Sequence, residues 1–166
     1  MRIEREDYLL HPADAVYPLV RDRIEELLPH LPGVDSVEIL SRVKEGKGKT
    51  RVRSRWRVRP PAFLGRLLPA AAFSWEEDAL WIDKRYCVES RILGYGYESA
   101  AQIFYEPASD YTRVRIGAEV TLRPDSVDIP KENLEKIVAG AEDALREAIE
   151  PNMTALLDAI RERLGP

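Results

Sequence analysis

Hydrophobic and polar residues alternate with a period of two along most of the chain between residues 34 and 122. This period is typical of strands with one buried face, and Gly-, Pro- and Asp-containing breaks divide the region into short segments. The expected strands span residues 1–9, 34–44, 51–59, 73–82, 85–93, 96–105 and 111–122. The expected turns are Gly46-Lys47-Gly48, Asp83-Lys84, Gly94-Tyr95-Gly96 and Glu106 to Asp110, and the apolar, proline-punctuated segment from Pro60 to Pro69 interrupts the sheet. The pattern therefore predicts about seven antiparallel strands.

A period of 3.6 residues appears in three places instead. Between the first and second strands it predicts two short helices, one from Pro12 that Pro18 limits or bends, and one from Asp22 to His30. Near the C-terminus an apolar stripe predicts one long helix from about Pro130 to Leu164. Asp128 is its expected cap, Gly165-Pro166 ends it, and Pro151 is expected to bend it. A long amphipathic helix must then cover a curved sheet.

The strand from Arg51 to Arg59 has the most regular alternation, Arg-Val-Arg-Ser-Arg-Trp-Arg-Val-Arg. Because side chains of a strand alternate between its faces, all five arginines project to one side, and Ser54 and Trp56 project to the other with two valines. An aromatic ring and a hydroxyl on the inner face indicate a surface against which something packs. The alternative is a solvated outer face over an ordinary core.

The same alternation identifies the residues that face inward on the other strands. If the charged residues of these strands point outward, the alternate residues point inward, and we regard these inward residues as candidate ligand contacts. From the sheet these are Ser54, Trp56, Trp75, Trp81, Tyr86, Ser90, Ala101, Ile103 and Ile116; the Pro60–Pro69 segment adds Phe63 and Leu64 as a candidate lid, and the terminal helix adds Ala141 and Leu145. The tryptophans and Tyr86 could equally be core residues, and the serines could be satisfied by local hydrogen bonds.

Glu77 is the candidate for acid–base chemistry. If Glu76 and Asp78 point outward toward the arginines, Glu77 points inward between Trp75 and Trp81. A carboxylate in such surroundings has a raised pKa and can act as an acid or base. The alternative is a bulge at Glu76-Glu77-Asp78 that leaves Glu77 exposed. Cys87 alternates outward without a basic or histidine neighbour, so no nucleophilic role is expected for it.

The order of elements resembles the helix-grip fold of the START-like (SRPBCC) superfamily, which includes polyketide-cyclase and coenzyme-Q-binding branches. Two stretches carry the resemblance. The first, 11–22 followed by 31–40, looks like the opening helix pair and second strand of the family, and the second is Trp75 to Asp83, with its tryptophan pair before a tight turn. The resemblance implies an α+β fold over 1–166 as a single domain, with the curved sheet wrapped around the terminal helix. It also implies an elongated cavity for a lipid, isoprenoid, polyketide or similar molecule. The arginine strand and the long terminal helix depart from typical members, and the superfamily has no universal catalytic motif.

The amino-acid composition further limits the expected domain count, location and binding partners. The chain has 166 residues with 33% charged and 45% hydrophobic, which is a globular balance for one domain. One cysteine allows no internal disulfide, and the N-terminus lacks the apolar run of a signal peptide, so a cytoplasmic location is expected. The two histidines lie beside prolines and are not clustered with other ligand types, so neither a metal nor a cofactor is expected. The net charge of −4 argues against general nucleic-acid binding.

Three functions fit these observations. The first is a carrier or sensor that binds a small hydrophobic ligand without catalysis. The second is an enzyme of the cyclase, aromatase or dehydratase type in which Glu77 moves protons. The third is an interaction module whose face from Arg51 to Arg59 binds an acidic protein, an anionic lipid or a nucleic acid. Neither the ligand nor the oligomeric state follows from the sequence.

Overall fold

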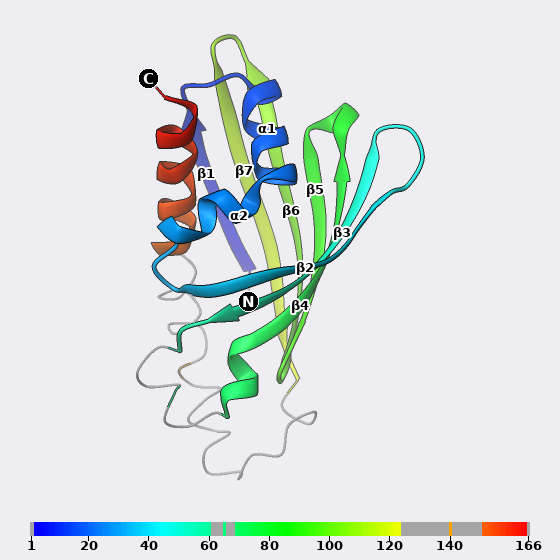
Figure 1. Ribbon diagram of the computed structural model, residues 1–166, viewed down its shortest axis with the longest axis vertical. Helices are drawn as coiled ribbons and strands as arrows, with labels where there is room; N and C mark the ends of the chain where they lie inside the picture. Colours follow the sequence, from blue (N-terminus) through cyan, green and yellow to red (C-terminus); the bar gives the residue numbers. More distant parts are fainter. Residues whose placement is uncertain (1, 61–64, 66–68, 124–139, 141–150, 166) are drawn as a thin grey trace.

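The computed structural model describes residues 2–60, 65, 69–123, 140 and 151–165. Seven strands form one antiparallel sheet with the order β1-β7-β6-β5-β4-β3-β2 (Figure 1). Their bounds are β1 Arg2–Leu9, β2 Val34–Lys44, β3 Lys49–Val58, β4 Ser74–Ile82, β5 Cys87–Gly94, β6 Tyr97–Ala108 and β7 Tyr111–Leu122. All seven expected strands are therefore present. Consecutive strands from β2 to β7 pair as neighbours, and β1 closes the order beside β7.

The helices lie on one face of this sheet (Figure 1). Helix α1 (Ala13–Asp22) and the one-turn helix α2 (Ile24–Leu27) follow β1, and a 3₁₀ turn at Leu28–His30 leads into β2. Two further 3₁₀ turns, Ala70–Phe73 and Asp83–Arg85, flank β4. The C-terminal helix, described over 151–164, stands beside β1. This is an α+β helix-grip arrangement, as the sequence pattern predicts.

Helix α1 packs its apolar face on the sheet around Tyr17. Val16, Tyr17 and Val20 recur at helical spacing, and all three are buried. The Tyr17 ring makes edge-to-face contacts with Trp81, Tyr86 and Tyr105 at centroid distances of 5.4, 5.6 and 5.8 Å. Its hydroxyl donates to the Cys87 carbonyl at 3.3 Å. Aromatic contacts from three separate segments therefore fix α1 against the sheet.

The register of β3 confirms that its arginines share the outer face. Glu76 and Asp78 of β4 lie opposite Arg55 and Arg53, respectively. Because directly opposed residues point to the same side of a sheet, ion pairs form there. The pairs are Arg51 with Glu45 and Asp78, Arg53 with Glu76, Arg55 with Glu38 and Glu76, and Arg59 with Asp35. The outer face of this part of the sheet therefore carries several ion pairs between arginines and carboxylates.

The structure corrects the expected turns after β4 and β6. Strand β6 continues through Ala108, so the expected turn from Glu106 to Asp110 contracts to Ser109 and Asp110, with Ser109 at a φ of 48°. Glu106 stays in the strand and accepts hydrogen bonds from Arg113 and Arg115 of β7. After β4 a 3₁₀ turn replaces the start of the expected strand 85–93. Tyr86 therefore lies in the turn, in a left-handed conformation, and β5 begins only at Cys87.

Bulges in β2 also break the regular alternation expected for residues 34–44. The register shifts between Val34 and Ser36 and again between Ile39 and Ser41. Beyond the second shift, Val43 lies opposite Arg51 on the outer face and is 54% exposed. Arg42 lies opposite Val52 on the inner face, and its guanidinium donates to the carbonyls of Asp22 and Arg21 at the end of α1. The extra residue at the second bulge therefore reverses which side chains of β2 point inward and which point outward beyond it.

Proline does not limit α1 as expected, because the helix continues for four residues beyond Pro18. In the C-terminal helix, Leu157 and Ile160 are buried in the core cluster, as the apolar stripe predicts. Gly165 has a φ of 81°, and its amide donates to the Arg161 carbonyl at 3.0 Å, which ends the helix. Asp128 and Pro130, the expected cap and start, lie outside the described residues. The expected bend at Pro151 depends on the preceding residues 141–150, which also lie outside them.

Candidate functional site

The strand registers place Glu77 on the inner face of the sheet. It lies opposite Ser54 of β3 and Ile92 of β5, and Trp75 and Ala79 flank it on the same face of β4. No bulge interrupts the pairing of β4 with either neighbour. The inward orientation expected for Glu77 is therefore confirmed, and the exposed alternative is wrong.

Two serines and an indole surround the Glu77 carboxyl group. Ser54 and Ser90 are 4% and 7% exposed, and both hydroxyls are hydrogen-bonding neighbours of Glu77, together with Trp56. The Trp56 indole Nε1 also donates to Ser54 Oγ at 2.9 Å. Burial raises the pKa of Glu77 above its ordinary value, more than these hydrogen bonds lower it. Glu77 keeps part of its surface accessible even so.

Trp56 and Trp75 extend this cluster toward one end of the sheet. They lie directly opposite each other on β3 and β4, with ring centroids 6.3 Å apart and an angle of 6° between the ring planes. Both are partly accessible. Their stacked rings give the inner face a flat aromatic surface next to the Glu77 carboxyl group.

The other aromatic candidates belong to the part of the inner face that α1 covers. Trp81 is 8% exposed and, like Tyr86, packs against Tyr17. Tyr105 lies there as well, and its pKa is raised by burial and by the Glu77 carboxylate. For Trp81 and Tyr86 the core interpretation is thus the better one.

The remaining candidates fall between these two regions or beyond the described residues. Ala101 lies opposite Ser90, and Ile103 lies opposite Ile116, with both isoleucines packed against the core cluster. Small residues thus continue the inner face next to the Glu77 cluster. Phe63, Leu64, Ala141 and Leu145 lie outside the described residues, so the structure does not place the expected lid or the expected helix contacts.

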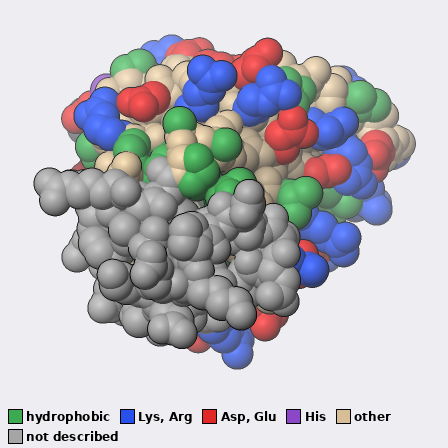
Figure 2. Space-filling view, turned by 90° about the horizontal axis from the view of Figure 1, so that it is seen from below, with side chains coloured by type: hydrophobic (Ala, Val, Ile, Leu, Met, Phe, Trp, Pro, Cys, Tyr) green, Lys and Arg blue, Asp and Glu red, His purple; other side chains and the backbone are tan. Residues whose placement is uncertain are grey.

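A hollow of about 650 Å³ lies mainly over outward-facing residues of β3 to β7. Arg53, Glu76, Asp78, Arg91 and Glu119 are among its lining residues, and Glu77 and Ile92 of the inner face also contribute to it. Figure 2 shows charged side chains of both signs interspersed over the visible part of the described surface. Arg53, Glu76 and Asp78 already form ion pairs, so the lining of this hollow is rich in paired charges and differs from the apolar cavity expected inside the sheet.

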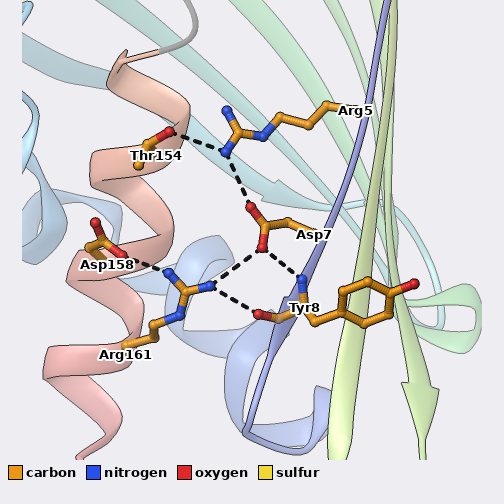
Figure 3. A network of polar contacts seen from close by, with 6 residues as sticks. All are labelled: Arg5, Asp7, Tyr8, Thr154, Asp158 and Arg161. Atoms are coloured by element: carbon orange, nitrogen blue, oxygen red, sulfur yellow. Dashed lines mark hydrogen bonds and ion pairs between the residues drawn. The ribbon is translucent and has the colours of Figure 1, made fainter.

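A polar network that the sequence did not predict joins β1 to the C-terminal helix (Figure 3). The register with β7 puts Arg5 and Asp7 on the inner face, opposite Ile116 and Val114. Arg5 donates to Asp7 at 3.1 Å and to Thr154 Oγ1 at 3.1 Å, and Arg161 donates to Asp7 at 3.4 Å and to the Tyr8 carbonyl at 3.0 Å. Burial opposes ionisation of Asp7, but the Tyr8 amide and the two arginines outweigh it and lower the pKa of Asp7. The signal in the sequence was the charged pair at alternate positions between Ile3 and Leu9.

Cys87 lies in the outward register, as expected, but is fully buried there, and burial raises the pKa of its thiol. Within the described ranges, no three side chains of the His, Cys, Asp or Glu type gather closely enough to hold a metal ion. No described helix is both long and apolar enough to cross a membrane.

Comparison with known proteins gives structural likeness and no sequence match. No family model matches the chain, and no curated protein matches it significantly. The solved structure of TTHA0849 from Thermus thermophilus is similar over 99% of this chain and 100% of its own, with a TM-score of 0.73 and 22% identity. The Zhui aromatase/cyclase from Streptomyces sp. R1128 is similar over 99% of this chain and 96% of its own, with a TM-score of 0.68 and 14% identity.

Two further structures widen the comparison. Norcoclaurine synthase from Thalictrum flavum covers 99% of this chain with 86% of its own, at a TM-score of 0.59 and 16% identity. A START superfamily protein from Mycobacterium smegmatis covers 90% of this chain with 94% of its own, at a TM-score of 0.52 and 16% identity. At these identities the likeness is one of fold, and together with the strand order and the helices it shows that this chain has the START-like helix-grip fold.

Proposed function

We propose that this protein binds a small, mainly apolar ligand reversibly on the inner face of its sheet, as a carrier or sensor. The observation that supports this best is the partly accessible inner-face cluster of Trp56, Trp75 and Glu77. An ordinary core at this position would be aliphatic, because an ionisable group is costly to bury without a partner. The structurally similar proteins include an aromatase/cyclase and a START superfamily protein, which is consistent with such a role.

The proposed site is the part of the inner face that α1 leaves uncovered. Trp56 and Trp75 provide an aromatic surface, and Ala101 and Ser90 are small enough to leave room beside them. Ile103 and Ile116 border the site where the core begins. Phe63, Leu64, Ala141 and Leu145 remain candidate contacts from the two covering segments.

A melting-temperature screen of fatty acids, isoprenoids, sterols and aromatic polyketides tests this proposal. Ligand binding stabilises the folded state by about 2.7 kcal/mol at a hundredfold excess over the dissociation constant, so a binder gives a clear rise in Tm. The rise should shrink in Trp56→Ala and Trp75→Ala, whereas Tyr111→Ala, at the tip of the β6–β7 hairpin, serves as the matched control. If no compound in the four classes raises the Tm, the proposal fails.

A second candidate function is acid–base catalysis of the cyclase, aromatase or dehydratase type. Glu77 favours it, because a carboxyl group whose pKa is raised by burial is suited to deliver and accept a proton. The test is incubation with a poly-β-ketone thioester and analysis of products by mass spectrometry. An enzyme yields a cyclised or dehydrated product that Glu77→Gln no longer forms, and a carrier returns the compound unchanged.

The third candidate, a docking surface at Arg51 to Arg59, has weaker support. Arg51, Arg53, Arg55 and Arg59 each contact a carboxylate of this chain. An external anion would have to compete with these internal partners.

A further inference from the structure

The polar cluster around Glu77 has a defined hydrogen-bond direction. An indole nitrogen can only donate, so Ser54 Oγ must be the acceptor in its 2.9 Å hydrogen bond with Trp56. The single Ser54 hydroxyl hydrogen is then left for Glu77, and Ser90 supplies a second hydroxyl from β5. Trp56 is a third hydrogen-bonding neighbour of Glu77, and three donors still do not fill the roughly four acceptor sites of a carboxylate. Glu77 therefore keeps capacity for one more hydrogen bond.

The position of Glu77 makes that capacity available to a ligand. Ser54 and Ser90 are buried on either side of it, whereas Glu77 itself and the neighbouring Trp56 and Trp75 keep accessible surface. A ring or chain lying along the two tryptophans would meet Glu77 at its polar end. The apolar and polar parts of the surface thus match a molecule with one polar group.

The charge around the cluster decides which polar group fits. On the inner face, the residues that flank or oppose Glu77 are Trp75, Ala79, Ser54 and Ile92, and none of these is basic. The Asp78 carboxylate on the other face of β4 further raises the pKa of Glu77. Among these described neighbours, a ligand carboxylate or phosphate would be desolvated without a compensating cation. A hydroxyl or carbonyl oxygen carries no such cost.

Building on the proposed function, we infer that the ligand is an uncharged apolar molecule whose hydroxyl or carbonyl oxygen hydrogen-bonds to Glu77 between Ser54 and Ser90. An alcohol, a phenol or a ketone fits this description. Fatty-acid anions and phosphate-bearing lipids do not. Glu77 then determines ligand specificity whether or not the protein is a catalyst.

Three probes that share one ring system test this inference: naphthalene, 2-naphthol and 2-naphthoate, titrated at pH 7 and followed by tryptophan fluorescence or calorimetry. One added hydrogen bond corresponds to about a 3- to 10-fold gain in affinity, so 2-naphthol should bind that much more tightly than naphthalene. The anion 2-naphthoate should bind least tightly. The inference is overturned if 2-naphthoate binds most tightly, or if naphthalene and 2-naphthol bind equally.

Variants locate the effect at Glu77. Glu77→Gln keeps a hydrogen-bonding group and should keep the preference for 2-naphthol, whereas Glu77→Leu should bring the ratio of the two dissociation constants to about 1. Glu76→Gln, one residue away on the outer face, is the matched control and should leave the ratio unchanged. An unchanged ratio in a folded Glu77→Leu variant contradicts the inference. The ranking of the three probes by the unaltered protein decides the matter even if that variant does not fold.

The same experiments separate this inference from the proposed function. If fatty-acid anions are the ligands that raise the Tm, the protein is still a binder of apolar molecules, and only the specificity assigned to Glu77 is wrong. If no naphthalene derivative binds and no compound of the Tm screen does, both proposals fail.

Discussion

Ser54 and Glu77 lie directly opposite each other on β3 and β4, and this pairing brings a hydroxyl donor to a carboxyl group on the inner face of the sheet. The two residues belong to strands with very different outer faces, one of arginines and one of carboxylates. The ion pairs on that outer face form in the same strand register as the inner pairing. The surface charges and the buried cluster are thus two sides of one strand pairing.

We expect the stability of the protein to depend on pH through Glu77. Its pKa in the folded state is raised above the unfolded value of 4.5, so its contribution to stability is fully present below that value and is lost as the pH rises through the folded pKa. Glu77→Gln lacks this titration. Its free energy of unfolding, measured by urea titration, should therefore improve relative to the unaltered protein as the pH is raised from 4.5 toward neutrality.

The neighbouring Glu76 provides a control of opposite sign. The hydrogen bond from Arg55 lowers the pKa of Glu76, so its contribution is present above the unfolded value and is lost on acidification. The free energy of unfolding of Glu76→Gln should therefore fall furthest below that of the unaltered protein near neutral pH. If the stability of Glu77→Gln, relative to the unaltered protein, changes with pH in the same direction as that of Glu76→Gln, the burial of Glu77 is contradicted.

We expect Gly94→Ala to destabilise the protein, because Gly94 lies opposite Tyr97 in the β5–β6 hairpin. A Cβ atom at Gly94 would come within 2.2 Å of the Tyr97 ring, which would have to move. Such overpacking costs about 1–3 kcal/mol. Gly117→Ala is the matched control, since a Cβ at that strand position meets nothing within 4 Å. Equal denaturation midpoints for the two variants would show that Tyr97 does not pack on Gly94.

The network between β1 and the C-terminal helix gives a third prediction. Asp7→Asn weakens the contacts with Arg5 and Arg161, and we expect a loss of about 1 kcal/mol in the free energy of unfolding. Amide hydrogen exchange in residues 154–161 should become faster, because that helix loses its polar attachment to β1.

Asp158→Asn is the control for this network. Asp158 is 58% exposed and pairs with Arg161 within the same helix, so its removal should cost at most about 0.5 kcal/mol. If amide hydrogens of residues 154–161 exchange equally fast in Asp7→Asn and Asp158→Asn, the contact with β1 does not stabilise the helix.

The fourth prediction concerns the arginines of β3. Arg53 and Arg55 have side chains that are 53% and 42% exposed, and exposed ion pairs contribute about 0–1 kcal/mol. Arg53→Ala or Arg55→Ala should therefore change the denaturation midpoint little. Since carboxylates already occupy these arginines, we also expect no submicromolar binding of DNA or RNA at physiological salt. Such binding, lost in the double variant, would restore the docking function.

The alternation of residues determined much of this protein. It predicts the seven strands, the outward arginines of β3 and the inward orientation of Glu77, because a strand pattern with a period of two specifies which side chains share a face. The helical spacing of apolar residues after Pro12 likewise predicts a short helix at α1. These are local properties of the backbone, so the sequence suffices for them.

The tertiary structure decided what covers each face. Tyr17 reaches Trp81 and Tyr86, and this contact assigns the two residues to the core, although their alternation is the same as that of Trp56. Arg5 and Asp7 face inward through the register of β1 with β7, and only the fold shows that the C-terminal helix, about 150 residues later in the chain, supplies Thr154 and Arg161 as their partners. Periodicity gives the direction of a side chain, but the partner that it meets there depends on the packing of elements far apart in sequence.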